Sequence, residues 1–449
     1  MTVRYITVTP VANFFKPATR AFGNIAIVGG VAPASTRLAA ALDTTATTLS
    51  VENSTGFPAT PFSIRIESET LSVTTATGTT WTVTRGAGGT TAAAHISGTA
   101  LSTGDPTGPI NVAIPITNPD SVSDPDDPAS TKNKKPVDSF DWFHGDLGKA
   151  VRTAFAQSPG PTIVWAVRNN GSNLADSFSV VGKLDVQIVL LANKPLTTAN
   201  TNDIKALAAH VTTLSGTGGG DGKERIGVAM LANAAAASTA GGLITGLGLT
   251  DSRMVVVAHK SDDDAAAAVA GTIAGYEPHI SLLLKPVGLA MADTFDDSEI
   301  ETLNSARVNW LTRPTLIPGN GLYMGEGYIS GDVKKAPYID IIRTIDDVSF
   351  RLKAQLIQSI GVLRINRPGL RTLESQMAAV LEPLKKREVI DNYDVFMPLL
   401  VLLDKDPATL SLLEAQQIKN ARDARTVDTI ITVTYAGAIH RLNITLKFQ

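Results

Sequence analysis

The segment from Gly216 to Lys223 comes closer than any other to a known chemical site. A phosphate-binding P-loop has the pattern G-x-x-x-x-G-K-[ST], in which backbone N–H groups surround the phosphate and the last hydroxyl binds Mg²⁺. Here Thr217 occupies the place of the first glycine and Glu224 that of the hydroxyl. A carboxylate there would repel phosphate, and the segment precedes a strand-like run instead of following one. The segment is therefore predicted to be a surface loop.

A second glycine-rich stretch, from Gly241 to Gly248, is equally poor as a nucleotide site. The glycine fingerprint of a dinucleotide-binding fold lies in the turn between a strand and a helix. These glycines lie within or after a predicted helix, where packing of small residues at a helix end explains them. The sequence thus predicts no nucleotide cofactor.

The histidines form no recognisable metal motif. No two have the i, i+4 spacing of a helical metal site, and no H-E-x-x-H occurs. His144 lies near Asp141 and Asp146, which could form an acid–base cluster, but the adjacent tryptophan and phenylalanine favour the start of an amphipathic helix. The six histidines are His95, His144, His210, His259, His279 and His440.

The remaining chemical groups indicate no catalysis either. Asp262–Asp264 lacks the D-x-D-x-D-G spacing of a calcium loop and suits the N-cap and acidic first turn of a helix. There is no G-x-S-x-G elbow, and without cysteine there is no thiol nucleophile, disulfide or cysteine metal site. We predict no catalytic residue, no metal and no cofactor, and expect that the protein is not an enzyme.

Composition narrows the class of protein. The chain has 449 residues, 43% of them apolar and 18% charged, which is ample for packed cores in two to four domains. A net charge of −3 lacks the basic excess of a nucleic-acid-binding protein. No run approaches the roughly 18–20 apolar residues that span a bilayer, and the N-terminus lacks the apolar centre of a signal peptide. We expect a soluble protein made in the cytosol, with no direct nucleic-acid partner and no membrane insertion.

The periodicity changes along the chain and predicts an α/β plus α+β fold with several domains. Residues 1–24 are predicted to be an extended arm, because prolines interrupt any helix there. Residues 25–37 and 106–290 form the expected α/β domain. A Thr/Ser/Gly-rich stretch, 38–105, has short alternating runs separated by turns and is predicted to be a small antiparallel β lobe inserted at the periphery. Residues 104–137 are predicted to be a surface loop.

Alternating strands and helices indicate a largely parallel sheet in the α/β domain. The strands are expected at 162–167, 186–191, 226–231 and 254–258, and the helices at 142–156, 202–214, 235–246 and 262–275. Residues 291–426 are expected to form a second, α+β domain. Its apolar helix face carries Leu373, Met377, Val380, Leu381 and Leu384.

A second helix of this α+β domain starts at the capping-box pattern Ser411–Glu414 and is expected to turn Ala415, Ile418 and Ala421 inward.

The last residues, 427–449, alternate more regularly than any other part of the chain. They predict a hairpin that turns at Ala436–Gly437, with a second strand from Leu442 to Phe448. A strand with one clean apolar face must join a sheet. Both ends of the chain could close its own sheets, or they could pair with neighbouring subunits by β-augmentation. The residues concerned are Val3, Tyr5, Ile6 and Val8, then Ile431, Val433 and Tyr435, and finally Leu442, Ile444, Leu446 and Phe448.

The segment 432–448, TVTYAGAIHRLNITLKF, resembles the ending of contractile tail sheath proteins. The helices expected at 340–361 and 372–386, followed by VIDNYDVFM at 389–397, are similar to the core layout of that family. AFGNIAIVGG at 21–30 is similar to the segment where sheath proteins enter their α/β domain, and the β lobe looks like their outward insertions. The N-terminus departs from the family, because VRYI at 3–6 stands where many sheath proteins have Pro-Gly-Val-Tyr.

The resemblance implies a structural subunit of a virion tail that polymerises around a tail tube as stacked hexameric rings or helical strands and then contracts to drive the tube through a cell envelope. It favours exchange of both terminal strands between subunits. It also implies tube, baseplate and tail-terminator proteins as partners. The family turns its C-terminal domain towards the tube, so Lys385, Lys386 and Arg387 are candidates for contacting an acidic tube; a helix C-terminus that complements its dipole is the other interpretation. The alternative function is an α/β nucleotide- or small-molecule-binding enzyme with a β accessory domain, which a nucleotide-dependent thermal shift would favour.

Overall fold

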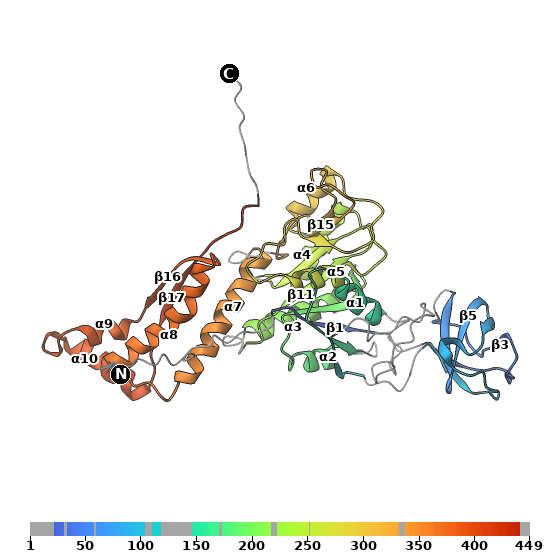
Figure 1. The fold of residues 1–449 in the computed structure, drawn as a ribbon, viewed down its shortest axis with the longest axis horizontal. Helices are drawn as coiled ribbons and strands as arrows, with labels where there is room; N and C mark the ends of the chain where they lie inside the picture. Colours follow the sequence, from blue (N-terminus) through green and yellow to red (C-terminus); the bar gives the residue numbers. More distant parts are fainter. Residues whose placement is uncertain are drawn as a thin grey trace, which may run out of the picture. The chain divides into compact units, whose positions relative to one another are not determined.

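The computed structural model of the chain describes residues 22–30, 34–57, 60–103, 110–117, 146–169, 173–216, 222–250, 252–331 and 337–440. These residues fall into two compact units, one from Phe22 to Asp340 and the other from Ile341 onward. The units appear in blue to yellow and in orange to red in Figure 1. The expected arms lie largely outside the described residues, because nothing is described before Phe22 or after His440.

A nine-stranded sheet organises the first unit, in the order β13-β15-β14-β12-β11-β10-β1-β9-β8. Its centre is parallel: β1 pairs with β9 on one side and β10 on the other, and β10, β11, β12 and β14 follow in parallel. Antiparallel strands close both ends. The strands are β1 (Asn24–Gly29), β8 (Ala113–Ile116), β9 (Ile163–Arg168), β10 (Ile188–Leu196), β11 (Ile226–Leu231), β12 (Met254–Ala258), β13 (Pro286–Val287), β14 (Asn309–Thr312) and β15 (Leu322–Met324).

Helices cover both faces of this sheet. Ala26 and Val28 of β1 pack in one cluster with residues of α2 (Leu174–Val181), α3 (Thr201–Gly216), α4 (Ala237–Leu247) and α6 (Asp297–Ser305). Their neighbours Ile25 and Ile27 are fully buried and point to the other face, since strand side chains alternate. There α1 (Asp146–Phe155) and α5 (Ala265–Gly275) pack on each other and on β1 and β10.

Burial on both faces explains why the central strands are continuous apolar runs. Every residue of β11 and of β12 is buried. Helix α5 is buried from Ala265 to Ala274, and a Cβ at its Gly271 would stand 2.3 Å from the carbonyl oxygen of Ala154 in α1. Glycine is therefore needed for α1 and α5 to approach this closely.

The β lobe forms a separate six-stranded antiparallel sheet in the order β2-β7-β4-β5-β6-β3. Its core surrounds Trp81, whose ring meets Phe62 edge-on at 5.4 Å. The chain enters the lobe after β1 and leaves it before β8, so it is an insertion into the α/β unit. The strands are β2 (Ser35–Arg37), β3 (Thr48–Ser50), β4 (Phe62–Ile66), β5 (Glu69–Thr77), β6 (Thr80–Thr84) and β7 (Ala100–Ser102), with a short 3-10 helix at Ala87–Gly89.

The second unit packs helices against a two-stranded antiparallel sheet. Strand β16 (Ile390–Phe396) pairs with β17 (Ile430–Tyr435). The helices are α7 (Ile339–Leu356), α8 (Arg367–Lys386), α9 (Pro398–Asp404) and α10 (Leu412–Ala424), with 3-10 turns at Ile357–Ser359 and Pro407–Thr409.

The predicted fold class is confirmed: an α/β and an α+β part, with a small antiparallel lobe inserted in the first. The expected boundary at residue 290 is wrong, because β14 extends the parallel sheet beside β12 and the first unit continues to Asp340. Helix α2 was not predicted. Asp264 is the N-cap of α5, so the acidic run precedes the helix and does not fill its first turn.

The expected C-terminal hairpin stays a prediction, because its second strand, Leu442–Phe448, lies outside the described residues. Its first strand is confirmed as β17. Among the described residues β17 pairs with β16, more than thirty residues earlier in the chain, and this pairing was not predicted. The capping box at Ser411 and Glu414 is confirmed, and Ile418 is buried, but Ala415 is exposed.

Candidate assembly surfaces

The inner face of the β16–β17 sheet is built by alternation. Val395 lies opposite Ile431, and Tyr393 opposite Val433. These side chains pack with Leu381 and Leu384 of α8 and with Val348 of α7. Ile431, Val433 and Tyr435 are all half-buried, as their common face predicts. One face of a two-stranded sheet is thus covered by the helices of its own unit.

The outer face of the same sheet is exposed. It carries Asp394 opposite Thr432, and Phe396 opposite Ile430. The last pair is apolar, yet 45% of Phe396 and 57% of Ile430 remain accessible. Among the described residues each strand pairs only with the other, so the outer edges of β16 and β17 both present backbone groups without a strand partner.

The end of α8 places the basic cluster next to this sheet. The helix begins at the N-cap Asn366, which accepts from the Gly369 N–H at 2.9 Å, and Lys385 and Lys386 lie in its last turn. The Lys385 ammonium donates to Asn392 of β16 at 2.8 Å. Nearby, the Tyr393 hydroxyl donates to Glu382 at 3.1 Å. Burial raises the pKa of Tyr393, and the Glu382 carboxylate raises it further. The cluster is exposed, and it is positioned by both α8 and β16.

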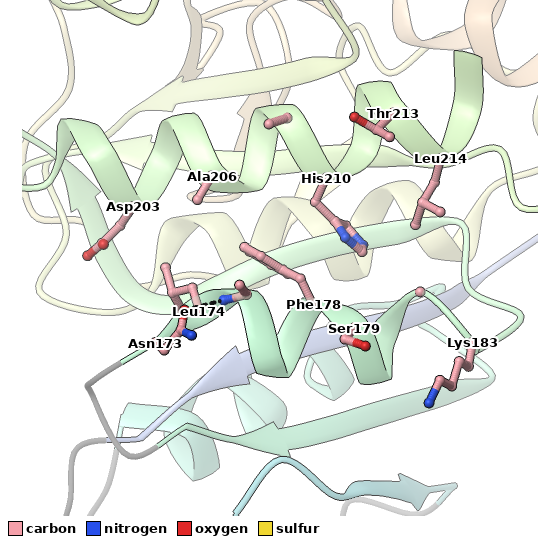
Figure 2. A pocket seen from close by; sticks show the side chains of 13 residues that line it. Asn173, Leu174, Phe178, Ser179, Lys183, Asp203, Ala206, His210, Thr213 and Leu214 are labelled. Carbon is pink, nitrogen blue, oxygen red and sulfur yellow. Dashed lines mark hydrogen bonds between the residues drawn. The ribbon is translucent and has the colours of Figure 1, made fainter. Parts of the chain in front are cut away.

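A groove lies between α2 and α3 on the first unit, with a volume of about 760 Å³. Figure 2 shows Phe178 of α2 and His210 of α3 pointing towards one another across it. Their rings stack with centroids 4.7 Å apart. Leu174 and Leu214 add apolar surface, while the ionic groups Lys183 and Asp203 also line it. Because α2 was not predicted, this groove was not predicted either.

The surroundings of His210, at the middle of the groove, keep this histidine uncharged near neutral pH. Burial, with a contribution from Arg225, lowers the pKa of His210 to about 4. Arg225 is fully buried below the groove and donates to the carbonyl oxygens of Val181 at 3.0 Å and Leu184 at 3.2 Å. The groove therefore suits an apolar occupant better than a charged one.

The β lobe contains a buried ionic network that the sequence analysis missed. The Glu69 carboxylate accepts from Arg85 at 2.7 and 2.8 Å and from the Ala93 N–H at 3.0 Å, and the His95 ring lies 2.9 Å from it. These interactions outweigh burial and lower the pKa of Glu69 to about 2. The sequence pattern could have indicated this network, because Glu69, Leu71 and Val73 alternate along β5 and therefore point to the same, inward face.

The strand ends of the nine-stranded sheet hold a second buried carboxylate. Asp264 accepts from the backbone N–H of Asn193 at 2.6 Å and of Ala267 at 2.9 Å. Burial raises the pKa of Asp264 to about 6 despite these bonds. Both bonds are structural, since one caps α5 and the other holds Asn193 at the irregularity within β10, where the pairing with β11 shifts between Leu190 and Pro195. Asp146 begins α1 and accepts from Asn193, whereas Asp141 and His144 lie outside the described residues.

The described parts of the chain contain no group of three or more His, Cys, Asp or Glu residues that could hold a metal ion. No helix among them is long and apolar enough to cross a membrane. The glycine-rich loop is described only from Gly222 onward, where it leads into β11.

Comparisons with solved structures identify the fold. The sheath of the PVC extracellular contractile injection system, in its contracted state, matches with a TM-score of 0.50 and 18% identity over 68% of this chain and 80% of that one. The helical sheath of the anti-feeding prophage in its contracted state matches with a TM-score of 0.48 and 15% identity, over 67% of this chain and 81% of that one. A sheath tail protein from Desulfitobacterium hafniense matches with a TM-score of 0.40 and 13% identity, over 88% of this chain and 92% of that one. No family model and no curated protein sequence matches the chain.

Proposed function

We propose that this chain, whose multidomain fold is that of a contractile-system sheath protein, is the sheath subunit of a contractile tail or injection apparatus. The observation that carries the proposal is the match with the PVC sheath, which extends over 68% of this chain. In this role the chain polymerises with copies of itself, as stacked hexameric rings or helical strands. Its role is structural and involves no catalysis.

The β16–β17 sheet supports self-assembly by strand exchange. A two-stranded sheet is marginal alone, and here only one face is covered. Neither of its edges has a strand partner within the described part of the chain, and the sequence has two β-prone ends, at residues 3–8 and 442–448. Strands donated by neighbouring subunits would satisfy the backbone groups of both edges. Ile431, Val433 and Tyr435 then belong to the accepting sheet, and Leu442, Ile444, Leu446 and Phe448 to a donated strand.

Strand exchange suits contraction for a physical reason. Backbone pairing provides strong joints, and the chain leading to each joint can change direction while the folded units move as rigid bodies. In the proposed function the sheath shortens around a tail tube and drives it through a cell envelope. The tube, baseplate and tail-terminator proteins are the proposed partners, and the virion tail or an equivalent particle is the proposed location.

Electron microscopy of the purified chain tests the proposal. We expect tubes or rings to form without added metal or nucleotide. A monodisperse monomer that persists at high protein concentration would overturn it. A nucleotide-dependent rise in melting temperature, in the absence of any polymer, would instead indicate a nucleotide-binding protein.

The β lobe is proposed to be dispensable for assembly. It has its own core around Trp81, and both of its connections lead to the α/β unit. Replacing residues 35–102 by a short Gly/Ser linker should leave polymers visible by electron microscopy. Loss of polymers from a variant that remains folded by circular dichroism would make the lobe part of the lattice.

A further inference from the structure

An exposed apolar knob lies on the same unit as the α2–α3 groove. Between β14 and β15 the chain makes a turn in which the Ile317 N–H donates to the Pro314 carbonyl oxygen at 3.1 Å. This turn presents Leu316, whose side chain is 94% exposed, more than any other large apolar side chain among the described residues. Pro314 and Pro318 restrict the backbone on both sides of it. The knob is a preorganised feature, and exposing it to water has a cost.

The knob and the groove match in polarity. Residues 314–321 carry no charged side chain, and Arg313 donates to the carbonyl oxygens of Met291 and Ala292. The groove is lined by Leu174, Phe178 and Leu214, with His210 neutral at pH 7 because its pKa is about 4. Of the two ionic groups in the lining, Lys183 is exposed and Asp203 pairs with Lys194 at 3.0 Å, so the knob can contact the apolar residues without burying an unpaired charge, which is the usual obstacle to such a contact. A volume of about 760 Å³ suits a short turn of chain.

The two features belong to different ends of one sheet. The knob follows β14, on the far side of β12, whereas α2 and α3 pack on β9, β10 and β11. A knob and a groove on separate surfaces of one unit form a heterologous contact, and such contacts repeat into rings or helical filaments. This is the type of contact that a polymer needs, whereas an isologous contact would end at a dimer.

We propose that the occupant of the α2–α3 groove is the Leu316 turn of a second copy of this chain. The contact would link the α/β units of neighbouring subunits directly, independently of the terminal strands. It rests on the proposed self-assembly, to which it adds a second joint made of rigid surfaces.

Cysteine crosslinking tests this contact directly, because the natural chain has no cysteine. Leu316→Cys places a thiol on the knob, and Ser179→Cys places one on the exposed side of α2 that lines the groove. Mixing the two single variants and oxidising them should give a covalent dimer of one chain of each kind. The matched control pairs Ser179→Cys with Leu412→Cys, a leucine that is 93% exposed on the other unit. We expect no comparable dimer from it.

The outcomes separate this contact from the proposed function. Polymers that show no 316–179 crosslink would overturn the contact and leave the sheath function standing. A crosslink between chains that form no polymer would keep the contact and overturn the sheath function. Absence of both polymer and crosslink would overturn both.

Two substitutions provide a second measurement. Leu316→Asp and Ala209→Arg, at an exposed position of α3 that lines the groove, should each raise the concentration needed for assembly at least tenfold. Neither should change the melting temperature of the unassembled chain, since both positions are exposed. Unchanged assembly with either variant would contradict the proposal.

Discussion

The nine-stranded sheet and the β16–β17 sheet differ in how their apolar faces are covered and how their strand edges are closed. The large sheet is covered by helices on both faces, and short antiparallel strands close its ends. Among the described residues, the small sheet has one covered face, one exposed face and no third strand on either edge. The first sheet is closed at both ends by strands of the described chain. The second has room for further strands at its edges, which is the property that a polymer-forming surface requires.

The strongest test of this contrast places a charge in each sheet. Val256 of β12 is fully buried between helices, whereas Thr432 of β17 lies on the exposed face. Val256→Asp should prevent folding of the first unit, because an unpaired buried carboxylate costs several kcal/mol out of a total stability of roughly 5–15 kcal/mol. Thr432→Lys, which places an ammonium opposite Asp394, should change stability by less than about 1 kcal/mol. Circular dichroism and denaturant titration measure the stability of the two variants. Similar losses of stability at the two sites would contradict the difference between the two sheets.

Two truncations test the small sheet more finely. Removing residues 441–449 leaves β17 in place, so the second unit should stay folded while polymers disappear. Removing residues 426–449 also deletes Ile431 and Val433 from the core shared with α8, at an expected cost of about 2–5 kcal/mol for each large side chain lost. The longer deletion should therefore unfold the unit.

Ile444→Asp tests the same segment as the deletion of residues 441–449, by a single substitution. A donated strand predicts lost assembly with little change in the melting temperature of the monomer. If 441–449 instead completed its own unit, both the short deletion and Ile444→Asp would lower that temperature sharply.

The sequence predicts those elements of this fold that depend on local patterns better than those that depend on contacts between distant segments. Strands β11 and β12 have the predicted bounds, because burial on both faces leaves a continuous apolar run that needs no knowledge of its partners. The pairing of β17 with β16 was not predicted, because the alternation of Ile431 and Val433 specifies a face but not which strand lies alongside. Residues 441–449 alternate equally well and are closer in sequence, so the local pattern favoured a hairpin. Helix α2 has only eight residues, too few for a helical period to stand out, and the groove it forms was missed with it.

The β lobe extends the comparison between sheets, since it is a small sheet stabilised partly by a buried ion pair between side chains. Glu69→Gln leaves Arg85 buried without its carboxylate and should destabilise the lobe by roughly 3–5 kcal/mol. Glu67 contacts the same His95 ring at 3.0 Å, but its side chain is 62% exposed. Glu67→Gln is therefore the matched control, with an effect below about 1 kcal/mol. Fluorescence of Trp81 reports on the lobe core, and equal effects would contradict a role for the buried network.

The pH dependence of the lobe follows from the same carboxylate. The pKa of Glu69 is lowered from 4.5 to about 2, so its contribution is present above pH 4.5 and is lost as the pH falls towards 2. We expect acid unfolding of the lobe in this window and its absence in Glu69→Gln. A lobe that melts identically at pH 2 and pH 6 would contradict this.

The strand ends of the large sheet should respond to pH in the opposite sense. The pKa of Asp264 is raised from 3.8 to about 6, so its contribution to stability is full below pH 3.8 and is lost as the pH rises through 6. The α/β unit should lose on the order of 2 kcal/mol between pH 4 and pH 8. Asp264→Asn should flatten this slope. The β16–β17 sheet offers the contrast, since the carboxylates of β16, Asp391 and Asp394, are exposed.

The smallest expected effect concerns the basic residues beside the small sheet. Reversing Lys385, Lys386 and Arg387 to glutamate removes charges that complement the α8 dipole, at about 0.3–1 kcal/mol each, so the second unit stays folded. If the cluster contacts an acidic tube, co-assembly with the tube should weaken and become less sensitive to salt, while sheath-only polymers still form. Lys419→Glu, on the exposed side of α10, is the control for Lys386→Glu alone, because each single reversal changes the net charge by the same amount. Equal co-assembly of the two variants would leave the cluster with only its structural role, in which Lys385 holds Asn392 and ties the end of α8 to β16.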